Sequence, residues 1–169
     1  MKRVMKSLFV ALMVGAVGLA SAVAGDAADI SNLVTGATSG NVNSSSSFTS
    51  GANTTVKGYV TAVESITIGA NSSVSGNVSA GESFTSGDQT KIKGSVRAKG
   101  DFTSGTNSSV GGNVQVGADF TSGAFSVITG NVFADGEVTL GAGSKILGSV
   151  HSGAHKITYG PDATVGSVK

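Results

Sequence analysis

Few side chains in this 169-residue chain are of types that carry out catalysis: it has two histidines and no cysteine. His151 and His155 lie close together in the sequence, and Asp162 is the nearest acid that follows them. A histidine can be the general base of an acyltransferase or a metal ligand, but both roles need further partners at defined spacing. No Ser-His-Asp order, nucleotide-binding glycine loop or calcium-binding repeat accompanies them. We therefore expect no enzyme, no catalytic residue, no cofactor and no metal site.

A cluster of basic side chains is a better candidate for binding. Lys91, Lys93, Arg97 and Lys99 alternate with apolar or small residues, so all four are expected to point outward from one short stretch. They could contact a polyanion, either an anionic glycan or the acidic surface of a neighbouring copy. The plainer interpretation is a solvated belt. Single-stranded nucleic acid would require interleaved aromatic residues, and this stretch has none.

A row of threonines is the third candidate. Threonine recurs at one fixed spacing from Thr49 to Thr139 and again at Thr158, between two positions expected to face inward. An ice-binding surface needs a flat array of two such columns, and charged residues interrupt the neighbouring column at Asp101 and Asp119. An ordinary threonine ladder on a β-sheet explains the row without a ligand.

The element that positions these side chains is an 18-residue repeat. The motif F-T-S-G occurs at residues 84–87, 102–105 and 120–123, and (V/I)-x-G-x-V recurs at the same period. With Phe84 as position 1 of a unit, position 11 is glycine and position 13 is valine in seven successive units. Position 1 is apolar throughout, and only its last step is longer than the period, by a single residue: Ile30, Phe48, Ile66, Phe84, Phe102, Phe120, Val138 and Ile157.

Each unit divides into three short strands, because apolar positions 1, 9 and 13 each have a small partner two residues away, at positions 3, 7 and 15. Alternate residues share one face of a strand. The pattern predicts an all-β, single-domain, triangular parallel β-helix of about eight coils, because one coil cannot bury its inward side chains without its neighbours. Glycines at positions 4 and 11 are expected at the corners, where positive φ is needed. The predicted core ladder comprises Phe48, Phe84, Phe102, Phe120, Val78, Val96 and Val114.

The N-terminal segment has a different character. Residues 1–24 combine Lys2, Arg3 and Lys6, an apolar run and the sequence A-V-A, which together predict a secretory signal peptide. The β-helix domain then spans residues 25–169. Removal of the three basic residues leaves eight basic against ten acidic residues, a net charge of −2. The mature chain therefore has no basic excess to recruit nucleic acid or an anionic membrane, and we expect it in the periplasm, on the cell surface or outside the cell.

The repeat resembles that of the bactofilins, a family of polymer-forming proteins. The segments I-K-G-S-V-R-A-K-G-D-F-T-S-G and V-S-G-N-V-S-A-G-E-S-F-T-S-G carry the resemblance, which covers residues 30–168. It implies a right-handed β-helix that polymerises end to end into filaments without a nucleotide. A weaker similarity to the left-handed hexapeptide-repeat acyltransferases stops at the six-residue strand spacing. Bactofilins are typically cytoplasmic, so the export signal indicates an exported variant.

These features predict an exported structural protein that assembles with itself and contacts cell-wall or surface glycan. The alternative is a monomeric β-helical module that binds a glycan or ice on one flat face. In the polymer, the junction would lie in the first and last coils, whose inward apolar residues would pack against another copy. The expected assembly residues are Ile30, Val42, Val165 and Val168.

Overall fold

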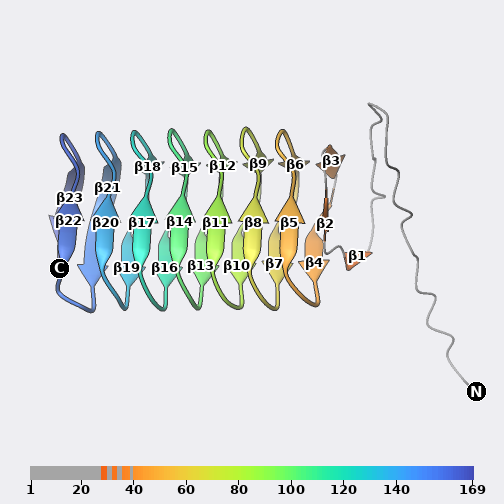
Figure 1. Ribbon diagram of the computed structural model, residues 1–169, viewed down its shortest axis with the longest axis horizontal. Coiled ribbons are helices and arrows are strands. Elements are labelled where there is room, and N and C mark those ends of the chain that lie inside the picture. Colours follow the sequence, from red (N-terminus) through yellow and green to blue (C-terminus); the bar gives the residue numbers. More distant parts are fainter. Residues whose placement is uncertain (1–27, 30–31, 34–35, 39) are drawn as a thin grey trace, which may run out of the picture.

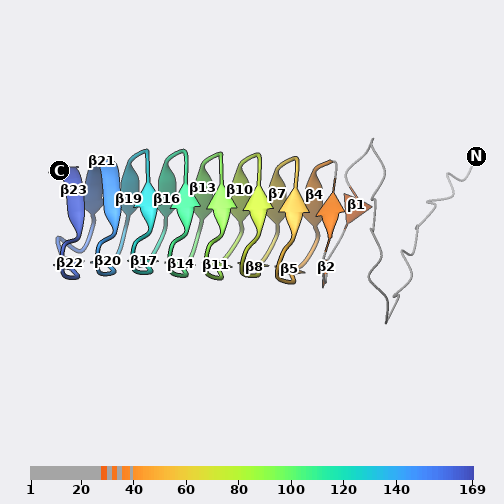
Figure 2. The same ribbon diagram turned by 90° about the horizontal axis from the view of Figure 1, so that it is seen from above.

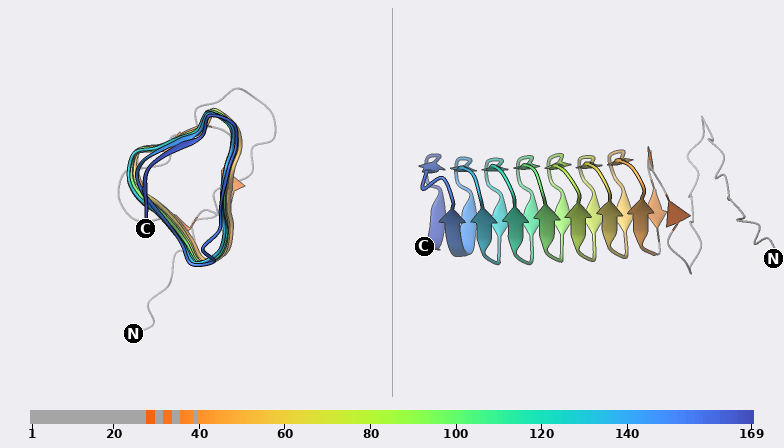
Figure 3. Two further views of the ribbon diagram at one scale, coloured as in Figure 1. Left: turned by 90° about the vertical axis from the view of Figure 1, so that its left-hand side faces the viewer. Right: turned by 90° about the horizontal axis from the view of Figure 1, so that it is seen from below.

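The computed structural model describes residues 28–29, 32–33, 36–38 and 40–169, and these form a parallel β-solenoid (Figure 1). The predicted signal peptide and Ile30 lie outside the described residues. Coils stack along the long axis from β1 to β23 (Figure 2). Viewed along that axis, they superimpose in a closed, three-sided outline (Figure 3). The predicted all-β, single-domain parallel β-helix is confirmed.

Two sheets build the walls. The smaller sheet has eight strands, one from each coil: β2 (Asn32–Leu33), β5 (Phe48–Ser50), β8 (Ile66–Ile68), β11 (Phe84–Ser86), β14 (Phe102–Ser104), β17 (Phe120–Ser122), β20 (Val138–Leu140) and β22 (Ile157–Tyr159).

The larger sheet has fifteen strands and forms the other two walls. The wall that carries position 9 contains β3 (Ala37–Thr38), β6 (Thr55–Val56), β9 (Ser73–Val74), β12 (Lys91–Ile92), β15 (Ser109–Val110) and β18 (Val127–Ile128). The wall that carries position 13 contains β1 (Ala28–Asp29), β4 (Val42–Ser44), β7 (Val60–Ala62), β10 (Val78–Ala80), β13 (Val96–Ala98), β16 (Val114–Val116) and β19 (Val132–Ala134). At the C-terminal end, β21 (Lys145–Ser152) and β23 (Thr164–Val168) are long enough to span the corner between these walls.

The register follows the repeat through the central coils. Phe84 pairs with Phe102, and Val78 with Val96, so each residue pairs with its equivalent in the next repeat. Every strand is therefore flanked by equivalent residues, and like side chains stack on like. The rings of Phe84 and Phe102 stack at a centroid distance of 5.3 Å, and those of Phe102 and Phe120 at 4.8 Å.

The predicted inward positions are buried. All seven residues of the predicted core ladder are at most 1% exposed: Phe48, Phe84, Phe102, Phe120, Val78, Val96 and Val114. Phe48 shares the column but is separated from Phe84 by Ile66. The threonines between positions 1 and 3 face outward, as expected, and most are exposed.

The corners correct one prediction. From Phe48 onward, positive φ falls at position 6 of each coil and, outside this pattern, at His155. Asparagine is the most frequent occupant of position 6, as at Asn53, Asn71 and Asn107, with φ of 59°, 56° and 56°. Asparagine tolerates this left-handed conformation. The glycines at positions 4 and 11 serve close stacking instead: a Cβ on Gly94 would lie 2.6 Å from Gly76 O in the preceding coil. Any larger residue there would force the coils apart.

The terminal coils depart from the regular step. Asn32 pairs with Thr49 rather than Ser50, and Ala28 pairs with Val42 rather than Ser46, so the first steps are shorter than the repeat. The 18-residue step therefore fails at β1 and β2, although it holds at β3, where Ala37 pairs with Thr55. Terminal repeats of solenoids are often atypical. At the other end, the extra residue falls between Ser152 and Ile157, within the stretch expected from the sequence.

Candidate functional site

The last coil ends in an open apolar surface. Its inward positions continue columns that are fully buried one coil earlier. Leu140 is 1% exposed and its partner Tyr159 is 45% exposed; Val150 is 0% exposed and its partner Val168 is 56% exposed. Val165 is half-buried against the core. The described residues contain no element that covers this end, so side chains of core type meet solvent.

Backbone N–H groups at this end also point outward along the rod. In regular coils, the N–H at position 1 donates to the following coil: Phe102 N–H to Asp119 O at 2.9 Å, and Val138 N–H to Lys156 O at 3.0 Å. Ile157 pairs with Val138 and so lies one coil further along. Its N–H therefore points out of the end of the rod, where a backbone carbonyl of another strand could accept a hydrogen bond from it.

The opposite end differs from the prediction. Val42 is predicted at an assembly end, but it is 0% exposed and its strand lies between β1 and β7. Strand β1 covers it, so Val42 belongs to the core. The other residue expected at this end, Ile30, lies outside the described residues.

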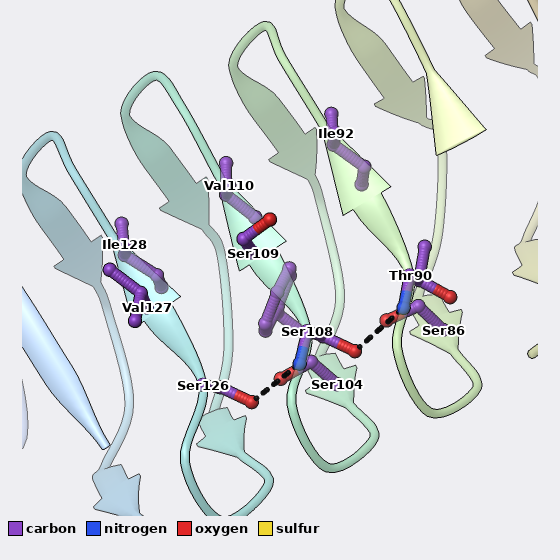
Figure 4. A pocket seen from close by; sticks show the side chains of 11 residues that line it. Ser86, Thr90, Ile92, Ser104, Ser108, Ser109, Val110, Ser126, Val127 and Ile128 are labelled. Carbon is purple, nitrogen blue, oxygen red and sulfur yellow. Dashed lines mark hydrogen bonds between the residues drawn. The ribbon is translucent and has the colours of Figure 1, made fainter. Parts of the chain in front are cut away.

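The interior offers no room for a substrate at its polar strip. Thr90 N–H donates to Ser108 Oγ at 3.2 Å, and Ser108 N–H donates to Ser126 Oγ at 3.3 Å (Figure 4). The Ser108 hydroxyl donates in turn to Gly87 O at 3.1 Å. The cavity between these serines and Ile92 measures ≈ 10 Å³, about the space of one water molecule. These hydroxyls therefore act as structural links between coils.

The two histidines lie apart from any cluster of metal-ligating type. Both are exposed, and the Nδ1 of His151 lies 3.2 Å from Lys169 O. In the part of the chain that the structure describes, no three His, Cys, Asp or Glu side chains come together so that they could hold a metal ion.

The four predicted polyanion contacts all lie on the surface. Lys91, Lys93, Arg97 and Lys99 are exposed and belong to one coil. Among the described residues the one ion pair lies elsewhere, between Lys156 Nζ and Glu137 Oε2 at 2.7 Å. The four cations therefore remain available to a partner.

Several exposed apolar side chains are not among the residues predicted from the sequence. Phe125 is 60% exposed, Leu147 59% and Phe133 40%. Phe133 and Leu147 stand at outward positions where earlier coils carry polar residues, and this break in the column is a usable signal. Phe125 occupies position 6 with φ of 55°, and its ring lies over Gly143 of the next coil.

Comparisons with known proteins return no match: no family model, no curated protein and no solved structure is similar to this chain. Within the described residues, no helix has the length and apolar character needed to cross a membrane.

Proposed function

We propose that this is an exported structural protein whose rods join end to end into filaments without a nucleotide. The observation that carries the proposal is the exposure of Tyr159 and Val168, which occupy columns that are buried in the preceding coil. A second copy is the occupant that fits, because its coils share the same outline and the same ladder spacing. The filament would form part of an envelope or surface scaffold.

The chemistry of the end favours association. Burial of a large apolar side chain contributes ~1.5–3 kcal/mol. Four apolar side chains of the last coil are not fully buried: Ile157, Tyr159, Val165 and Val168. Outward-directed N–H groups such as that of Ile157 would add the register of a continued β-ladder. Against these gains stands the loss of translational and rotational freedom, ~4–15 kcal/mol. We therefore expect reversible, concentration-dependent assembly.

Two features of the sequence support the biological setting. The repeat resembles that of the bactofilins, whose members polymerise in this manner. The A-V-A sequence after an apolar run supports export to the periplasm, the cell surface or the extracellular space. Self-association and contact with cell-wall or surface glycan are the interactions proposed for the mature chain, without nucleic acid or membrane as a partner.

The test places a charge in the junction. Val168→Asp puts a short carboxylate into a dry interface, and Thr158→Asp adds the same charge to an outward position of the same coil. Val165→Lys and Thr103→Lys form a second pair. We expect both valine variants to abolish filaments in negative-stain images and light scattering, and both threonine variants to retain them. Circular dichroism verifies that β-content is unchanged.

The outcome of this experiment also decides the alternative function. The exposed threonine row, from Thr49 to Thr158, favours a monomeric module that binds a glycan or ice on one flat face. If the unmodified mature protein forms monodisperse short rods at micromolar concentration, this alternative replaces the filament. Normal filaments from Val168→Asp would place the junction away from the last coil.

A further inference from the structure

The charged side chains are sorted by position around the rod. Six of the ten acidic residues lie in the turns that lead from the position-13 wall into the smaller sheet, and we call them the acidic edge: Glu64, Glu82, Asp101, Asp119, Asp135 and Glu137. Lys91, Lys93 and Arg97 project from β12, β13 and the turn between them, and we call them the basic face. The two groups occupy different parts of the triangular outline, but Lys99 stands in the same turn as Asp101 and so lies within the acidic edge.

These charges are not neutralised within the described part of the molecule. Of the nine residues, only Glu137 forms an ion pair, and its partner is Lys156. All three cations of the basic face are exposed, as are five of the six carboxylates, Glu137 being half-buried. Asp101 and Asp119 also accept backbone N–H groups of the next coil, at 3.1 and 2.8 Å. Their ladder holds the carboxylates in place without cancelling their charge.

We infer that the acidic edge of one rod is a docking surface for the basic face of a second copy, so that rods also associate side by side. The axial positions match. The basic face lies in the coil that ends at Asp101, whereas the acidic edge extends two coils to either side, to Glu64 and to Glu137. Two copies at the same height therefore place three cations opposite the middle of the acidic edge.

The contact would not close on itself. One copy contributes its edge and the other its face, so the pair keeps one free face and one free edge for further copies. Heterologous contacts of this kind generate open arrays unless their rotation closes a ring. Together with end-to-end growth, this inference deepens the proposed filament into a bundle or a sheet, and to that extent it rests on the proposed function.

The strength of the contact follows from its exposure. Exposed ion pairs each contribute little and are screened by salt. The Debye length is ~30 Å at 0.01 M salt and ~3 Å at 1 M. A filament repeats the contact once per copy, and linked weak contacts combine into stronger binding. Lateral association should therefore be strong at low salt and vanish at high salt, whereas the apolar end junction persists.

A charge-swap experiment tests the inference. The first variant reverses the basic face with Lys91→Glu, Lys93→Glu and Arg97→Glu. The second reverses part of the acidic edge with Glu64→Lys, Glu82→Lys and Asp135→Lys, and leaves intact the carboxylates that bond the backbone. Small-angle scattering and negative-stain imaging at low and high salt, with a chelator present, measure the width of the particles. Circular dichroism verifies the fold of each variant.

We expect each variant alone to form single-width particles and an equimolar mixture of the two to recover the salt-sensitive width of the unmodified protein. The inference is overturned if the mixture stays at single width, if the unmodified protein shows no lateral association at low salt, or if widening requires added Ca²⁺. It is also overturned if dextran sulfate, rather than a second copy, is what the basic face needs for association. Repeating the experiment with Val168→Asp separates the two proposals, because loss of end-to-end growth would leave lateral pairing of single rods.

Discussion

Equivalent positions in the central coils and in the last coil have the same side-chain direction but different burial. Val150 and Val168 are paired neighbours on the parallel strands β21 and β23, yet the first is 0% exposed and the second 56%. Leu140 and Tyr159 show the same contrast. The difference lies in the presence of a following coil. Burial in this fold is therefore supplied by the neighbour, and a coil at an end retains an unsatisfied apolar surface.

The contrast has an energetic counterpart. A central coil is packed and hydrogen-bonded on two sides, whereas the last coil is packed on one side only. In a solenoid, stability is approximately a sum over coils and the interfaces between neighbours. A substitution should therefore cost most where two interfaces share the changed side chain.

The largest effect is expected in the aromatic ladder. Phe102 stacks on Phe84 and on Phe120 and is 1% exposed. Phe102→Ala leaves a cavity shared by two interfaces and should lower the free energy of unfolding by about 3–5 kcal/mol. Urea unfolding followed by circular dichroism measures the change.

Two controls sharpen this prediction. Thr103→Ala changes the outward neighbour and should stay within about 0.5 kcal/mol of the unmodified protein. Ile157→Ala changes the same column in the last coil, where the side chain is half-buried, and should cost less than Phe102→Ala in non-assembled protein. Equal costs for Phe102→Ala and Thr103→Ala would contradict the assignment of inward and outward faces.

A smaller effect is expected from the stacking glycines. A Cβ on Gly94 would lie 2.6 Å from Gly76 O, whereas a Cβ on Gly40, in the same column, meets no atom of the described residues within 4 Å. Gly94→Ala should therefore cost about 1–3 kcal/mol through overpacking, and Gly40→Ala should change stability by at most about 0.5 kcal/mol. Thermal and urea unfolding of the two variants measures the difference. Equal tolerance at both sites would mean that the coils separate without cost.

The smallest effect is expected at the left-handed corner, where a substitution should stabilise the protein rather than destabilise it. Phe125 has φ of 55° and is 60% exposed, so it occupies a strained conformation with little burial in return. Phe125→Asn should raise the free energy of unfolding by up to about 1 kcal/mol, because asparagine adopts this region readily. The converse change, Asn107→Ala, should lower it by a similar amount. A loss of stability in Phe125→Asn would show that the ring packed over Gly143 outweighs the strain.

Much of the fold is predictable because a strict period leaves few arrangements. Phe84, Phe102 and Phe120 recur at that period, and like residues must then stack if each coil is one period long. The alternation around Val96 and Arg97 likewise places one inward and the other outward. The open last coil is expected from Val165 and Val168. The covered position of Val42 is not, because strand β1 pairs Ala28 with Val42 and so departs from the regular period.

The sequence by itself determined the period, the three strands of each coil and the direction of each side chain, because these depend on local alternation and on the repeat length. Tertiary structure alone decided how tightly the coils approach and how the ends are finished. Glycine at position 11 has several local explanations, and only the 2.6 Å approach of a Cβ on Gly94 to Gly76 O identifies stacking as the reason. The left-handed conformation at Asn71 depends on the path between two walls, and the register of the first coil on one-sided packing. The approach of the coils, the path of the corner and the register of the first coil all depend on contacts between residues far apart in the chain, so no local pattern encodes them.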